Sequence, residues 1–150
     1  MRVSWNSLLE EIYACEKCRL CRGRKNVVPG EGRLDAELMF IGEGPGEQED
    51  LQGRPFVGAS GELLTRMIRA IDLSREDVYI CNVVKCRPPG NRNPSPDEAQ
   101  ACIGYLRSQV ALVRPRIIVL LGKIAARYTL KEDIFITRDH GKWFEQKGTL

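Results

Sequence analysis

Apolar residues are arranged along the chain in two patterns that alternate. Three short runs are almost wholly apolar, at positions 38–41, 78–84 and 116–121. Each of these runs predicts a buried strand. Between them, apolar residues recur at every third or fourth position, as they do on one face of a helix. Strands that alternate with helices and lack a polar face predict a parallel sheet covered on both faces.

Four segments have the helical spacing. The first leads into Cys15, and the second starts near Ser60, whose hydroxyl suits an N-cap. The third has the clearest start, because Ser95 and Glu98 have the spacing of a capping box. The last begins at Lys123. This order places the loops 42–46 and 82–87 at the C-terminal ends of strands, where parallel sheets bind ligands.

Size and charge restrict the possibilities only moderately. A chain of 150 residues fits one domain, and we expect residues 1–150 to form one. Its longest apolar run is far shorter than the roughly 20 residues that span a bilayer, and its first residues do not resemble a signal peptide. We therefore expect a cytoplasmic protein that acts as a monomer. The net charge of +3 is compatible with a nucleic-acid partner but does not require one.

Six cysteines are the most informative feature of the composition. Disulfides are rare in a reducing compartment, so metal ligation is the better interpretation. The two candidate pairs are Cys15 with Cys18 and Cys86 with Cys102. Four thiolates suit either tetrahedral zinc or an iron–sulfur cluster, and the spacing alone does not separate the two. Cys21 is a rival ligand, whereas Cys81 lies within an apolar run that favours the core.

Several motifs, taken in order and with their spacing, resemble the family 4 uracil-DNA glycosylases. They are the Cys15-x2-Cys18 pair and the segments 28–32, 42–50, 53–58, 82–89 and 91–94. The resemblance implies a three-layer α/β/α fold with a central four-stranded parallel sheet. It also implies a 4Fe–4S cluster on the four paired cysteines. The implied activity is hydrolysis of the N-glycosidic bond of deoxyuridine in DNA.

The same resemblance assigns residues to a base-binding pocket. Phe56 matches the family's stacking residue, and Asn82 matches the residue that reads the uracil edge. An amide carries a donor and an acceptor, which suits the N3–H and O4 of uracil and not cytosine. The glycine turn at 42–46 would hold the O2 side of the base and the attacking water, with backbone N–H groups that stabilise developing charge.

The sequence offers more than one candidate for the activation of water. Gly44 stands where the best-known uracil glycosylases, of another family, have an aspartate. Activation would then depend on Glu43, on Glu49 or on the substrate itself. The family pattern places Glu49 near C5 of the base, where it would help to exclude the methyl group of thymine. A solvated loop charge is the alternative for both glutamates.

Basic residues near Cys86 are candidates for DNA phosphate contacts. They are Lys85, Arg87 and Arg92, and Ser60 at a helix start is a further candidate. The alternative for each is an ordinary solvated side chain.

One part of the family pattern is not found. The family carries a His-Pro motif that supplies a histidine to uracil O2 and a leucine to the DNA stack, and nothing after Trp143 matches it. The single histidine, His140, does not match either and is expected at the surface. We therefore expect a chain shortened at its C-terminus relative to the family, which binds uracil-DNA weakly and cleaves it slowly. Two other functions fit the cysteines alone: a zinc- or cluster-stabilised DNA-binding module without catalysis, and an electron-transfer iron–sulfur protein.

Overall fold

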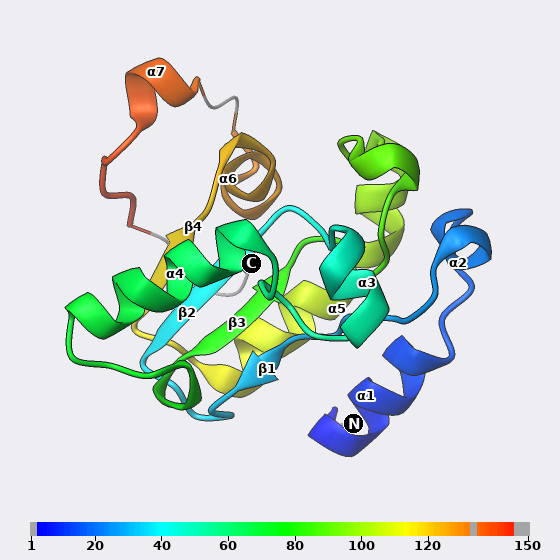
Figure 1. Ribbon diagram of the computed structural model, residues 1–150, viewed down its shortest axis with the longest axis horizontal. Helices are drawn as coiled ribbons and strands as arrows, with labels where there is room; N and C mark the ends of the chain where they lie inside the picture. Colours follow the sequence, from blue (N-terminus) through cyan, green and yellow to red (C-terminus); the bar gives the residue numbers. More distant parts are fainter. Residues whose placement is uncertain (1–2, 133–134, 146–150) are drawn as a thin grey trace.

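The computed structural model describes residues 3–132 and 135–145 (Figure 1). Its strands are β1 (Glu31–Gly32), β2 (Leu38–Gly42), β3 (Tyr79–Asn82) and β4 (Ile117–Leu120). Its α-helices are α1 (Trp5–Tyr13), α2 (Leu20–Gly23), α3 (Glu47–Gln52), α4 (Ala59–Ala70), α5 (Pro96–Val113), α6 (Lys123–Leu130) and α7 (Ile136–Asp139). Two short 3₁₀ turns, η1 (Arg75–Asp77) and η2 (Pro89–Asn91), complete the described elements. The three strands predicted from apolar runs are therefore confirmed.

The sheet has the strand order β1-β3-β2-β4. Strands β2, β3 and β4 are parallel, as predicted. The prediction of a wholly parallel sheet is corrected at one edge, because β1 pairs with β3 in the antiparallel direction. In the register of the sheet, Gly42 lies opposite Asn82. The glycine turn after β2 and the polar end of β3 therefore meet at the same edge.

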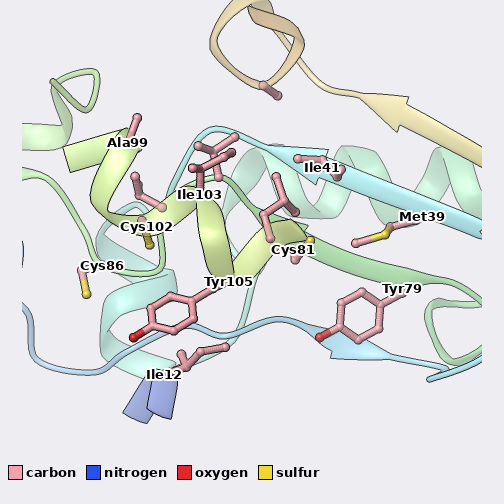
Figure 2. Close-up of a cluster of buried hydrophobic side chains, with 14 of the residues drawn as sticks. Ile12, Met39, Ile41, Tyr79, Cys81, Cys86, Ala99, Cys102, Ile103 and Tyr105 are labelled. Carbon is pink, nitrogen blue, oxygen red and sulfur yellow. The ribbon is translucent and has the colours of Figure 1, made fainter. Parts of the chain in front are cut away.

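Alternate residues of the strands face opposite layers, which confirms the three-layer α/β/α arrangement. Met39, Ile41, Tyr79 and Cys81 belong to one core cluster, which also contains residues of α1, α5 and α6. Figure 2 shows these four with Ile103 and Tyr105 of α5. Phe40 and Ile80 point to the other face, where they pack with Leu64 and Ile68 of α4. Helices α4 and α5 consequently cover opposite faces of the sheet (Figure 1).

The start of α5 agrees with the prediction from the sequence, and the start of α4 differs from it. Helix α5 begins with the predicted capping box of Ser95 and Glu98. Helix α4, in contrast, has Gly58 as its N-cap, so Ser60 is the second residue of the helix and not its cap. The reason is that Gly58 N–H donates to the Glu49 side chain, 2.7 Å away, which fixes the turn two residues earlier. No helix in the described part of the chain is long and apolar enough to cross a bilayer.

Candidate active site and cysteine cavity

A cavity opens at the C-terminal ends of β2 and β3. The sequence analysis predicted a ligand site at this edge of the sheet. Its volume is about 390 Å³, which lies within the range of small-molecule sites. All five residues predicted to bind the base line this one cavity: Glu43, Gly44, Glu49, Phe56 and Asn82. The predicted phosphate ligands Ser60 and Arg92 also reach its wall.

The Phe56 ring and the Asn82 amide flank the same small space above Gly42. A methyl group built on Gly42 would overlap the Phe56 ring and lie 2.5 Å from Asn82 Oδ1. Only glycine therefore fits at the end of β2, and the ring and the amide lie close enough to contact one planar ligand. Asn82 is 2% exposed, and its Oδ1 has no hydrogen-bond partner among the residues that the structure describes. Buried polar atoms are nearly always paired, so this oxygen is available to a ligand.

Phe56 is held in an unusual backbone conformation. Its φ is 51°, in the left-handed region that bulky residues rarely adopt. Arg75 of η1 donates from Nη1 to the Phe56 carbonyl at 2.8 Å and from Nη2 to the Pro55 carbonyl at 2.7 Å. Gly61 of α4 packs so tightly on the Phe56 carbonyl that no side chain fits there. Arg75 was missed by the sequence analysis, because it follows the loop by 19 residues and carries no motif.

Glu49 lines the cavity, but its carboxylate is fully engaged with the backbone. Oε1 accepts from Gly46 N–H at 3.0 Å. Oε2 accepts from Val57 N–H at 2.9 Å and from Gly58 N–H at 2.7 Å. The side chain therefore ties the glycine turn to the loop that carries Phe56. This geometry favours a positioning role over the predicted activation of water.

Glu43 and Gly44 differ from Glu49 in what surrounds them. The Glu43 carboxylate is half-buried, and burial raises its pKa above the ordinary value for a glutamate. It makes no hydrogen bond or ion pair with any residue that the structure describes, so it is free to meet a water molecule in the cavity. Gly44 has no room for a carboxylate, because a Cβ there would lie 2.7 Å from Cγ2 of the buried Val84.

A second, apolar cavity lies between α1, α2 and the start of α5. Its wall contains both predicted cysteine pairs, Cys15 with Cys18 and Cys86 with Cys102, together with Cys21. Cys86 and Cys102 are also members of the core cluster drawn in Figure 2. Arg24 donates to Cys86 Sγ at 3.3 Å and to the Cys15 carbonyl at 2.8 Å. Burial raises the pKa of Cys102 to about 11, so this thiol is neutral at pH 7 unless a metal replaces its proton. Cys81 lies in the core, as predicted.

Comparison with known proteins shows the family of this chain. Residues 29–150 match the sequence model of the Uracil DNA glycosylase superfamily. The chain belongs to the type-4 family of the uracil-DNA glycosylase superfamily. It is 55% identical over 126 residues to the type-4 uracil-DNA glycosylase of Saccharolobus solfataricus. These aligned residues cover 83% of the chain and 58% of that protein. The type-4 enzymes of Archaeoglobus fulgidus and Thermotoga maritima are 49% and 50% identical, over 95% and 93% of the chain and 73% of each relative.

The predicted phosphate ligands of this uracil-DNA glycosylase family member lie in different surroundings. The prediction for Lys85 is wrong, because its side chain is 1% exposed and its ammonium binds protein atoms. Arg92 is largely committed to Glu98, which it contacts through both Nη atoms at 2.7 and 2.8 Å. Arg87 is half-buried and donates to Asn91 Oδ1 at 2.7 Å. Ser60 is exposed in the first turn of α4, a position that suits the original prediction. His140 is exposed, as expected.

Glu98 connects the segments that carry the two cysteine pairs. Its side chain is 1% exposed and accepts from Arg92, from Arg19 Nε at 2.9 Å and from Ser95 N–H at 2.8 Å. Arg19 directly follows Cys18, and Glu98 lies one helical turn before Cys102. These donors, Arg92 foremost, hold the pKa of Glu98 well below its ordinary value.

We expect Glu98→Gln to lower the free energy of unfolding at pH 7 by about 2 kcal/mol, since hydrogen bonds to a charged group are lost. A carboxylate with a lowered pKa stabilises the fold above its unfolded pKa of about 4.5, and this contribution declines as the pH falls further. In urea unfolding, the difference in unfolding free energy between wild type and variant should therefore shrink between about pH 5 and pH 3. The exposed neighbour Asp97→Asn is the control, with a change below about 0.5 kcal/mol. A gap that does not change with pH would contradict the assignment.

Proposed function

We propose that this protein releases uracil from DNA by hydrolysing the bond between C1′ of the sugar and N1 of the base. The observation that carries the proposal is the buried Oδ1 of Asn82, which lies beside the Phe56 ring and has no hydrogen-bond partner in residues 3–132 and 135–145. Uracil presents an N–H at N3 and a carbonyl at O4, which match the acceptor and donor of one amide. Cytosine has the opposite pattern at these atoms. A base in a duplex must be extruded before it can enter such a cavity.

The glycine turn and Glu43 supply the remaining chemistry of the proposal. The C1′–N1 bond breaks with its electron pair left on the base, and the oxygen of water bonds to C1′ while one of its protons leaves. Backbone N–H groups of the turn at 42–46 stabilise the negative charge that develops on the base. Glu43 orients the water and takes its proton, and Glu49 contributes by holding the turn and the Phe56 loop together.

A water-activating Glu43 gives a testable pH dependence. Burial raises the pKa of Glu43, so the carboxylate needed as a base is lost as the pH falls through a value above 4.5. We expect Glu43→Gln to lower the single-turnover rate about 10²–10³-fold and to remove the acidic limb of the pH–rate profile. Glu47→Gln, in the first turn of α3, is the matched control with an unchanged profile. An acidic limb that persists in Glu43→Gln would assign it to another group.

We also propose that the cysteine cavity holds a 4Fe–4S cluster on Cys15, Cys18, Cys86 and Cys102, with Cys21 as the rival ligand. The proposal is supported by the position of all four thiols in the wall of one apolar cavity, and four thiolates suit an iron–sulfur cluster or tetrahedral zinc. The residues present fit such a cluster, whose contribution when bound is to cross-link the N-terminal segment to α5.

The proposed substrate is uracil-containing DNA, with Ser60 and the N–H groups that begin α4 as phosphate ligands. Arg87 adds positive charge beside the cavity. A single-domain monomer that acts in the cytoplasm remains our prediction for the rest of the biology.

The proposed function is tested by an assay of base release from duplexes that carry uracil, thymine or hypoxanthine opposite guanine. We expect release of uracil and about a hundredfold slower release of thymine, whose methyl group must enter next to Glu49 of α3. Absence of uracil release by the iron-loaded protein would overturn the proposal. Equal release of all three bases would overturn the role given to Asn82.

A further inference from the structure

Lys85 places a positive charge in the interior of the protein. Its side chain is 1% exposed, and its Nζ donates to the Asn82 carbonyl at 2.7 Å and to Gln109 Oε1 at 2.6 Å. No carboxylate pairs with it in residues 3–132 or 135–145. Burial of an ammonium without a carboxylate is unfavourable. In the described part of the chain, the two groups that accept hydrogen bonds from the ammonium are neutral, and one of them is the backbone carbonyl of the base-reading residue Asn82.

Gln109 fixes the position of the ammonium from the other side. It lies in α5, is 0% exposed, and uses its Nε2 to donate to the Pro29 carbonyl at 2.8 Å and to Tyr79 Oη at 3.1 Å. Both ends of the Gln109 amide are therefore paired. Buried polar networks are rigid when all their hydrogen-bonding groups are paired. This network therefore holds the lysine in one place.

Two hydrogen-bonded peptide groups lead from Lys85 to the cavity. The Asn82 carbonyl shares a peptide group with Val83 N–H, which donates to the Gly42 carbonyl at 2.9 Å. That carbonyl shares its own peptide group with the N–H of Glu43, a residue of the cavity wall. The Glu43 N–H donates to no group in the described part of the chain. Each bond in such a series polarises the next, so the ammonium strengthens the partial positive charge at Glu43 N–H.

We propose that Lys85 is a positioning residue that holds Asn82 in place and, through the peptide groups of Asn82 and Gly42, stabilises the negative charge that develops on the departing base. The inference rests on the proposed function and adds a residue that does not contact the substrate. It gives a role to a lysine that follows β3 and is nevertheless buried. It also gives Lys85 a different role from Arg87, which lies two residues further along and is only half-buried.

The dependence of the rate on the leaving group tests this role. Fluorine at C5 withdraws electrons, so the 5-fluorouracil anion needs less stabilisation than the uracil anion. In Lys85→Gln, which keeps a donor but removes the charge, we expect single-turnover release of uracil to fall about 30-fold and release of 5-fluorouracil about fivefold or less. Binding of a duplex with a non-cleavable 2′-fluorinated deoxyuridine should change by less than about threefold. A purely structural role would slow both bases equally.

Two further variants keep the test decisive. Gln109→Glu places a carboxylate against the Lys85 ammonium and offsets its charge, and we expect the same larger loss for uracil than for 5-fluorouracil. Cys81→Ala, a buried change in the same strand as Asn82, is the control for destabilisation and should affect both bases by the same factor. If Lys85→Gln does not fold, as judged by circular dichroism, Gln109→Glu alone decides. Equal losses for the two bases, or none, in the folded charge-removing variants overturn the inference. Failure of the wild type to release either base overturns the proposed function instead.

Discussion

Asn82→Ala is expected to lower the single-turnover rate of uracil release by about 10³-fold, which corresponds to about 4 kcal/mol of transition-state stabilisation. The buried Oδ1 of Asn82 has no partner in the described part of the chain. Its contact with N3–H is therefore formed only when a base enters. Removal of the amide deletes this contact and the one to O4. The measurement is gel-resolved strand cleavage at abasic sites, with the enzyme in excess over DNA.

Asn93→Ala is the matched control for that experiment. Asn93 is exposed, and the hydrogen bond that it accepts from Arg92 is to its backbone carbonyl and not to its side chain. We expect its variant to react within about twofold of wild type. An Asn82→Ala rate within threefold of wild type would contradict the assignment of Asn82 as the residue that reads the base.

Cys86→Ser is expected to remove the proposed cluster, to lower the melting temperature by about 10 °C or more, and to weaken DNA binding at the same time. Each kcal/mol of lost stability corresponds to roughly 2–4 °C in a chain of this size. Cys86 lies at the end of the segment that begins with Asn82, so loss of the cross-link releases the wall of the base cavity as well. Iron content, visible absorbance and thermal unfolding are measured on the same preparation.

Cys21→Ser separates the proposed ligand set from its rival. Cys21 lines the same cavity as the four proposed ligands. We expect this variant to keep its iron, its colour and its melting temperature. Loss of the cluster in Cys21→Ser would make Cys21 a ligand. A Cys86→Ser protein that loses the cluster but melts like wild type would show that the cluster does not brace the fold.

The strands of the parallel sheet and the start of α5 could be predicted from sequence because their signals are local. Apolar runs gave β2, β3 and β4, and the Ser95 and Glu98 pair gave the start of α5. Strand β1 gave no such signal. It has only two residues, Glu31 and Gly32, and it forms because the backbone of Val78 and Tyr79 passes within contact of Gly32. An edge pairing of that kind depends on the fold and not on apolar pattern.

The candidate site was predictable in its members but not in their roles. Five residues expected to bind the base do line one cavity. The sequence shows that Lys85 is charged, yet its burial depends on Gln109, 24 residues away, and on the carbonyl of Asn82. Glu49 likewise resembles a free acid until its three backbone donors are known. Long-range partners of polar side chains decide such roles, and a single sequence does not reveal them.

The central claim is that Phe56 and Asn82 grip one extruded pyrimidine between them, and a crystal structure of the protein with uracil bound tests it most directly. The account predicts a uracil ring stacked on Phe56, with N3 about 2.7–3.2 Å from Asn82 Oδ1. Uracil bound without contact to either side chain, or bound outside this cavity, would contradict it.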